Sequence, residues 1–165
     1  MSKNVFFVCL NYGYAGKIAN ETALNCGKFF LDINELMEYS LGDLKRVKKL
    51  CGLEYLKKQQ RKTLFDVKNY ENTIANISYD FVIDEEYSEL FNNSLVVFIK
   101  LERKELTKMN IFKTDDDNLN IELIVMEELN KLIESKATVV INSEGKMKKD
   151  IKTIQAELKK HKFGE

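Results

Sequence analysis

Lys17 is the first residue whose position suggests chemistry. It follows Gly16, shortly after the apolar run 5–10, in the stretch NVFFVCLNYGYAGKIANETA of residues 4–23. A strand, a loop and a Gly-Lys pair at the start of a helix form a typical phosphate site. Backbone N–H groups at the helix N-terminus face the anion, and the lysine neutralises its charge. The spacing therefore predicts that residues 11–17 wrap an anion-sized hollow.

The same stretch departs from a complete phosphate-binding loop at both ends. The pattern opens with a glycine, where this chain has Asn11, and it closes with a Ser or Thr that binds Mg²⁺, where this chain has Ile18. Weak phosphate binding without Mg²⁺ is therefore expected. The alternative is a strand–turn–helix corner that carries a surface lysine. The candidate phosphate-binding residues are Gly13, Ala15, Gly16, Lys17 and Ile18.

Composition favours one globular domain. The chain has 165 residues, of which 44% are hydrophobic and 32% charged, enough for a sizeable core. Lys plus Arg and Asp plus Glu each number 26, and this zero net charge argues against a nucleic-acid partner. The three arginines are Arg46, Arg61 and Arg103, so bidentate phosphate clamps are scarce.

Several other kinds of site are disfavoured by residue type. Cys9, Cys26 and Cys51 form no CxxC pair, which argues against a disulfide framework or a zinc site, and His161 is the one histidine. Three adjacent acids at 115–117 are expected to face solvent, so no metal site is predicted. No apolar run reaches transmembrane length and the start is too short for a signal peptide, so we expect a cytoplasmic protein without a membrane partner.

Five short apolar runs alternate with helical segments. The runs cover residues 5–10, 29–33, 73–77, 95–101 and 137–141, and three of them are almost continuously apolar. Such runs are typical of strands buried on both faces of a parallel sheet. Leucine and valine recur at three- and four-residue spacings over 41–72 and 118–135, and 146–162 predicts an amphipathic helix. The order predicts an α/β domain.

Taken together, these segments resemble the shikimate kinase family. Residues 5–19, VFFVCLNYGYAGKIA, are similar to its first strand and P-loop, and NCGKFFLDINELME of 25–38 is similar to its F-x-D-x-D segment. GLEYLKKQQRKTL of 52–64 resembles its F-R-x-x-E helix. NSLVVFIKL of 93–101 resembles the strand before its lid, and LNKLIESKATVVIN of 129–142 resembles its closing segment.

The resemblance implies a fold and an activity. It implies one P-loop kinase-like domain over 1–165, with a five-stranded parallel sheet in the order 2-3-1-4-5, helices on both faces and a lid over 101–120. It also implies a transferase of aromatic amino acid biosynthesis that binds ATP and a small-molecule ligand such as shikimate. Ile18 speaks against the Mg²⁺ that this chemistry uses, because it replaces the Ser/Thr ligand.

Residue by residue, the match to that family is incomplete. Lys17 and Asp32 fall on its catalytic lysine and on the aspartate that supports the metal. Its second aspartate, which binds shikimate hydroxyls, falls on Asn34, and its carboxylate-binding arginine falls on Lys57. An amide supplies no charge, and a lysine lacks the bidentate fork.

Two further family motifs are absent from the sequence. The glycine turn after the third strand is replaced by ISYDF of 77–81, and 101–120 contains no lid arginine motif. Tyr12, Tyr14 and Tyr79 are expected to fill space that glycines leave. We therefore expect a shikimate-kinase-like pseudoenzyme with weak or absent ATP-dependent phosphorylation, which retains nucleotide, phosphate or ligand binding. The alternative is a functional shikimate kinase. The sequence identifies no protein partner.

Overall fold

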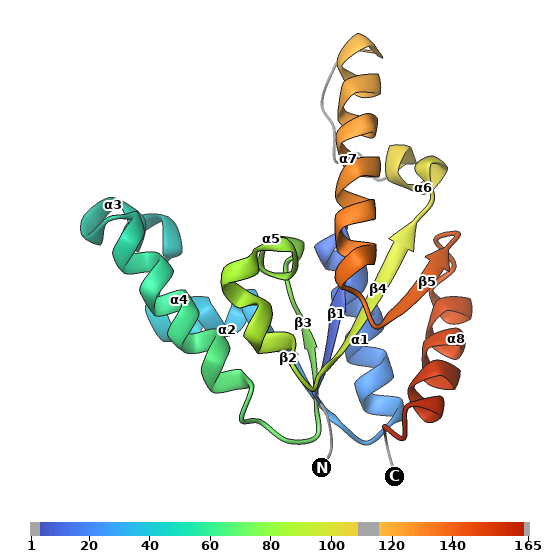
Figure 1. The fold of residues 1–165 in the computed structure, drawn as a ribbon, viewed down its shortest axis with the longest axis horizontal. Helices are drawn as coiled ribbons and strands as arrows, with labels where there is room; N and C mark the ends of the chain where they lie inside the picture. The colour runs from blue at the N-terminus through green and yellow to red at the C-terminus, as the bar shows by residue number, and fades with distance from the viewer. Residues whose placement is uncertain (1–3, 109–115, 164–165) are drawn as a thin grey trace.

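The computed structural model describes residues 4–108 and 116–163, with the backbone alone for 116–120. A five-stranded parallel sheet lies at its centre, and Figure 1 shows the strands flanked by helices. The strands are β1 (Val5–Val8), β2 (Phe29–Asp32), β3 (Thr73–Asn76), β4 (Leu95–Leu101) and β5 (Val139–Ser143). Their order, β2-β3-β1-β4-β5, confirms the predicted topology.

The central strand β1 alternates its side chains between two apolar layers. Val5 and Phe7 join the layer under helices α1 (Tyr12–Asn25) and α8 (Met147–Lys160). Phe6 and Val8 join the opposite layer, which includes residues of α2 (Ile33–Leu41) and α4 (Leu53–Val67). All four side chains are fully buried. This explains the continuous apolar run, because a strand covered on both faces needs apolar residues at every position.

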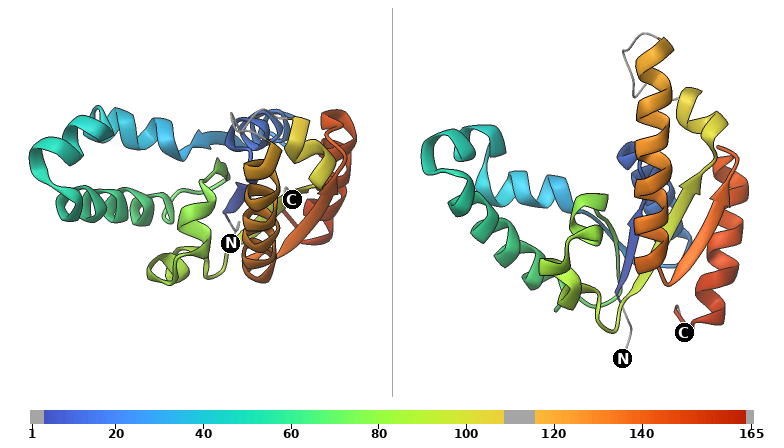
Figure 2. Two further views of the ribbon diagram at one scale, coloured as in Figure 1. Left: turned by 90° about the horizontal axis from the view of Figure 1, so that it is seen from above. Right: turned by 45° about the horizontal axis from the view of Figure 1, so that its top comes forward.

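The segment 41–72 folds as several helices. After α2, the chain forms α3 (Leu44–Cys51) and α4, with breaks at Gly42 (φ 80°) and Gly52 (φ 87°). A positive φ is strained for residues with a Cβ, so these glycines end the helices that precede them. In Figure 2, α2, α3 and α4 form an arm that projects from the sheet, with α3 at its far end.

The remaining helices surround the other strands. A short α5 (Tyr79–Ile83) and the 3₁₀ helix η1 (Glu85–Phe91) connect β3 to β4, and α6 (Arg103–Lys108) follows β4. The long helix α7 (Asp116–Lys136) precedes β5 and extends beyond the sheet in Figure 1. Within the described part of the chain, no helix is both long and apolar enough to cross a bilayer.

Candidate functional site

The carboxyl end of the sheet meets the N-terminus of α1, the position where open α/β folds bind ligands. Helix α1 begins already at Tyr12, and Asn11 is its N-cap. The Asn11 side chain accepts from the Tyr14 N–H at 2.9 Å, and its carbonyl accepts from the Ala15 N–H at 3.1 Å. Residues 12–17 are therefore helical, so the predicted loop conformation over residues 11–17 is wrong, whereas anion binding at this helix start stays a prediction.

Tyr12 fills one side of this site. Its hydroxyl donates to Asp32 Oδ1 at 2.6 Å and accepts from the backbone N–H of Asn34 at 3.2 Å. Asp32 is the last residue of β2 and the N-cap of α2, where it also accepts from the Glu35 N–H at 3.0 Å. Both of these hydrogen bonds to Asp32 end on Oδ1, so Oδ1 is occupied by the helix cap and the tyrosine.

Asn76, the last residue of β3, completes the Tyr12 side. Its Nδ2 donates to the Tyr12 carbonyl at 3.1 Å and lies 3.5 Å from Asp32 Oδ2. The residue is fully buried. A Cβ on Gly16 would lie 3.0 Å from this nitrogen, so Gly16 allows α1 to approach β3 closely. We call Tyr12, Asp32 and Asn76 the Tyr12 cluster.

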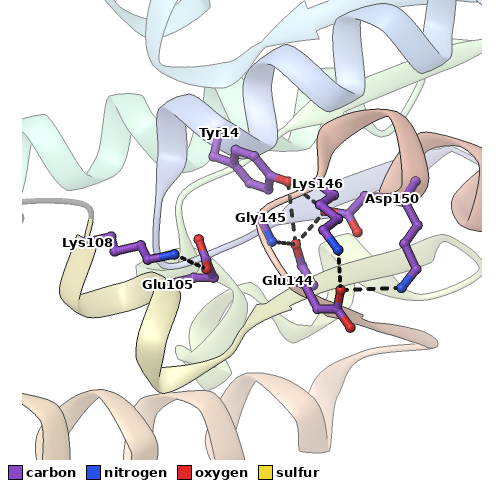
Figure 3. Close-up of polar contacts among 9 residues, drawn as sticks. Tyr14, Glu105, Lys108, Glu144, Gly145, Lys146 and Asp150 are labelled. Carbon is purple, nitrogen blue, oxygen red and sulfur yellow. Dashed lines mark hydrogen bonds and ion pairs between the residues drawn. The ribbon is translucent and has the colours of Figure 1, made fainter.

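Tyr14 fills the other side of the site. Its hydroxyl donates to Asp150 Oδ2 at 2.6 Å and lies 3.4 Å from Ser143 Oγ. Ser143 ends β5 and also donates to Asp150, which lies in the first turn of α8. Ser143 and Asp150 are 0% and 3% exposed. Figure 3 shows the Tyr14 ring directed toward Asp150, and we call these three residues the Tyr14 cluster.

The loop after β5 is packed against α6 beside the Tyr14 cluster. Gly145 has φ 76°, and a Cβ there would collide with the Glu105 carboxylate. Its N–H donates to Ser143 Oγ at 3.1 Å, and Glu105 pairs with Lys108 at 3.1 Å (Figure 3). The positive φ explains why a glycine stands at this turn, because the Glu105 carboxylate ends a flexible side chain that can move aside.

Both tyrosine hydroxyls are held in their neutral form. Burial, followed by the hydrogen bond to Asp32, raises the pKa of Tyr12. Burial, followed by the hydrogen bond to Asp150, raises the pKa of Tyr14. Burial also raises the pKa of the nearby Cys9 thiol to about 12, so this thiol is not a reactive nucleophile. The two tyrosine hydroxyls act as hydrogen-bond donors, which suits a packed interior.

The predicted phosphate-binding residues do not converge on one point. Lys17 is exposed on α1, whereas Ala15 and Ile18 are fully buried in the apolar layer beneath this helix. Helical geometry explains the division, because residues three apart share one face of a helix. Gly13 is exposed in the first turn, and Gly16 faces Asn76.

The predicted substrate-binding residues lie on the arm. Asn34 is in the first turn of α2, where its backbone contacts Tyr12, and Lys57 is exposed on α4. Among the described residues, no hydrogen bond or ion pair joins Lys57 to Asn34 or Asp32. The structure thus brings Asp32 and Asn34 together through the Tyr12 hydroxyl.

The residues present do not fit a magnesium-bound nucleotide in this conformation. Mg²⁺ requires oxygen ligands, but Ile18 offers a buried hydrocarbon and Asp32 already accepts from Tyr12 and Glu35. Phosphate would compete with the Asn11 cap for the first N–H groups of α1. No group of three or more potential metal ligands gathers within the described ranges.

Sequence reasoning missed Asn76, Ser143 and Asp150. Each of the first two ends a strand, and side chains at the carboxyl ends of parallel strands share one edge of the sheet. That position was the available signal. The pairing of Tyr14 with Asp150 spans 136 residues, and no local pattern reveals it.

Comparison with known proteins identifies the fold of this chain. No protein-family model and no curated protein matches the sequence. Among solved structures, shikimate kinase from Bacteroides thetaiotaomicron superposes with a TM-score of 0.80 at 15% identity, covering 96% of this chain and 99% of that one. The chain has the shikimate kinase fold.

Two other shikimate kinase structures agree. The enzyme from Aquifex aeolicus gives a TM-score of 0.76 at 18% identity, covering 98% of this chain and 99% of that one. The enzyme from Acinetobacter baumannii, in complex with shikimate, gives 0.73 at 13% identity, covering 97% and 95%. The resemblance noted in the sequence is confirmed at the level of fold, and identities this low carry no statement about activity.

Proposed function

We propose that this chain is a non-catalytic shikimate-kinase-like protein, in which the site for phosphoryl transfer has become a packed helix start. The observation that carries the proposal is that α1 begins at Tyr12, before the Gly-Lys pair. In that arrangement, the Tyr14 N–H bonds to the Asn11 side chain and the N–H groups of Ala15–Lys17 point back along the helix, so the run of N–H groups over residues 12–17 does not form a cradle around phosphate.

The two tyrosine clusters support the same proposal. Tyr12 and Tyr14 place aromatic rings and neutral hydroxyls where a charged ligand would need donors. Removing one prearranged transition-state donor typically costs about 10²–10³-fold in rate. The replacements at Ile18 and Asn34, together with the missing lid arginine motif, act on the same transfer. ATP-dependent phosphorylation of shikimate is expected to be negligible.

A weaker binding role remains part of the proposal. Lys17 is exposed beside the N-terminal turns of α1, where a helix dipole favours anions. Phosphate or nucleotide binding there is expected to be weak and independent of Mg²⁺. The alternative, a functional shikimate kinase, has one observation in its favour, which is the superposition on shikimate kinases over nearly the whole chain.

Calorimetry tests these proposals directly. The purified chain is titrated with ATP, ADP, inorganic phosphate and shikimate, with and without Mg²⁺, and ADP release is followed in a coupled assay with shikimate. We expect no measurable turnover and no increase in nucleotide affinity on adding Mg²⁺. Turnover above the rate of a Lys17→Ala variant would refute the non-catalytic proposal and support the alternative.

The Lys17→Ala variant tests whether Lys17 contributes to weak phosphate binding. If Lys17 contacts the anion, its loss should abolish the residual phosphate signal. The matched control is Lys152→Ala, which removes an exposed lysine of a different helix, α8, and should leave that signal unchanged. Equal phosphate affinity in all three proteins would mean that Lys17 is a surface residue without a ligand.

A further inference from the structure

The arm of α2, α3 and α4 carries a concentration of positive charge that the net charge conceals. Residues 44–62 contain eight basic residues and one acid, Glu54, although the whole chain is neutral. Arg61 pairs with Glu86 and stacks on Phe65. The other seven basic residues are exposed, and none has an ion pair among the described residues: Lys45, Arg46, Lys48, Lys49, Lys57, Lys58 and Lys62.

Helix α3 is amphipathic, yet none of its residues is fully buried. Lys45, Lys48 and Lys49 recur at three- and four-residue spacing and therefore lie on one side of the helix. Leu44 and Val47 on the other side are only half-buried. An amphipathic helix in a folded protein normally buries its apolar side, so α3 is left with an incompletely covered one.

Exposed apolar side chains gather where α3 turns into α4. Leu50 is 69% exposed, Leu53 is 44% exposed and Tyr55 is 48% exposed, and these residues flank the turn at Gly52. The arm projects from the body of the molecule, with α3 at its far end (Figure 2). The exposed basic and apolar residues of α3 and of the start of α4 therefore lie at the end of the arm that is remote from the sheet.

We propose that the far end of this arm, formed by α3 and the start of α4, docks on an anionic lipid surface. An interfacial helix combines lysines that attract anionic headgroups with leucines and aromatic residues that enter the boundary of the acyl chains. A nucleic acid would satisfy the lysines but would leave Leu50 and Leu53 without an apolar partner. Lysine also outnumbers arginine, which is the preferred residue for contacts to phosphates and bases of nucleic acids.

Charge complementarity predicts how strongly the affinity for an anionic membrane depends on the lysines and on salt. Each lysine close to an anionic membrane contributes about fivefold in affinity, so three lysines contribute about a hundredfold. The attraction reaches only about 8 Å at physiological salt and weakens at higher salt. The docking surface is separate from the helix start at Tyr12, so this inference does not depend on whether the chain binds nucleotides.

Co-sedimentation with vesicles is the test. The full chain is mixed with phosphatidylcholine vesicles that contain about 30% phosphatidylserine, and with vesicles of phosphatidylcholine alone. We expect binding to the anionic vesicles only, lost on raising the salt to about 0.5 M. The variant Lys45→Gln/Lys48→Gln/Lys49→Gln should bind about a hundredfold more weakly. The control Lys131→Gln/Lys136→Gln/Lys160→Gln, with the same charge change at paired lysines, should bind within about tenfold of wild type.

Leu50→Ser tests the apolar contribution, and Leu132→Ser is its control at a leucine of α7 that is 52% exposed. Leu50→Ser should weaken vesicle binding about tenfold or more, because a leucine side chain no longer leaves water. Circular dichroism checks that all variants remain folded. Three results would overturn the proposal: no vesicle binding, equal effects of the two leucine variants, or tighter binding to a 20-base-pair duplex DNA than to the anionic vesicles.

Discussion

Tyr12 and Tyr14 stand two residues apart in the first turn of α1, and each donates a hydrogen bond of 2.6 Å to a carboxylate. The two partners differ in their surroundings. Asp32 is half-buried and also caps α2, whereas Asp150 is 3% exposed beside the fully buried Ser143. Water can therefore replace a lost partner of Asp32, but it does not reach the buried Asp150 and Ser143.

The comparison indicates different roles for the two clusters. The Tyr12 cluster ties α1 to the start of the arm, since Asp32 and the Asn34 backbone both bind the Tyr12 hydroxyl. The Tyr14 cluster ties α1 to α8 through the end of β5. We infer that the Tyr14 cluster contributes more to the stability of the domain, while the Tyr12 cluster mainly fixes where the arm begins.

The largest expected effect comes from removing the buried carboxyl group. Asp150→Ala leaves the buried Ser143 hydroxyl and the half-buried Tyr14 hydroxyl without their common acceptor. A buried unsatisfied group costs about 1–3 kcal/mol, and we expect a loss near the upper end, about 3 kcal/mol. Asp32→Ala should cost about 1–2 kcal/mol, mainly the loss of an N-cap. Urea unfolding of both variants measures the difference. A larger loss for Asp32→Ala would reverse the ranking of the clusters.

A second comparison uses the two glycines of the same helix. Gly13→Ala adds a Cβ whose nearest neighbour is Asn11 Oδ1 at 3.7 Å, an ordinary contact, and should stabilise the helix by about 0.5 kcal/mol. Gly16→Ala places a Cβ 3.0 Å from Asn76 Nδ2, which is held by Tyr12 and buried, so it should destabilise by about 1 kcal/mol. Thermal unfolding in parallel should give shifts of opposite sign.

The glycine comparison also tests the helix start itself. If residues 12–17 formed a loop around an anion, alanine at Gly13 would gain nothing from helix propensity. Equal destabilisation by both alanines would therefore contradict the helical conformation of this segment. Added phosphate should change neither result, because the proposed anion contact is weak.

The sequence predicts the fold here far better than it predicts the site. The five apolar runs are found close to their predicted positions, because burial on both faces of a parallel sheet leaves a continuous signal in each strand. The breaks at Gly42 and Gly52 were visible as glycines but were not used to divide the segment 41–72. The positive φ of these glycines depends on the direction that the chain takes after each helix, and the spacing of apolar residues carries no information about that direction.

The early helix start differs from the predicted loop because a Gly-Lys pair carries little information about backbone conformation. Asn11 caps the helix through its side chain, and this moves the helix start ahead of Gly16. An asparagine at the first position of the motif is a good N-cap, so the signal was present but was interpreted as a lost glycine. The contacts of Tyr14 with Ser143 and Asp150 depend on tertiary structure alone.

Removing single hydroxyl groups should have a smaller effect than removing the carboxyl group of Asp150. Tyr14→Phe should cost about 1–2 kcal/mol, because the buried Asp150 loses a donor that water does not replace. Tyr12→Phe should cost less than about 1 kcal/mol, since Asp32 is half-buried and keeps the Glu35 N–H. Chemical unfolding of both variants measures these costs. Identical costs would mean that the difference in burial between the two carboxyl groups has no energetic consequence.

The last prediction concerns alkaline pH. The pKa values of Tyr12 and Tyr14 are raised in the folded protein, while an unfolded tyrosine titrates near about 10. Above that pH, the unfolded state has lost protons that the native state retains. The contribution of Tyr12 and Tyr14 to the free energy of unfolding is therefore fully present below a pH of about 10 and decreases as the pH rises further. Tyr79 and Tyr87, whose pKa values burial also raises, contribute a background to this loss. The double variant Tyr12→Phe/Tyr14→Phe should therefore lose less stability between pH 9 and 11 than wild type, measured by urea unfolding at each pH.

The control Tyr55→Phe, at an exposed tyrosine of α4, should keep the wild-type slope of unfolding free energy against pH. An unchanged slope in the double variant would mean that neither hydroxyl is protected in the folded state, and it would remove the basis for treating the two clusters as packed interior.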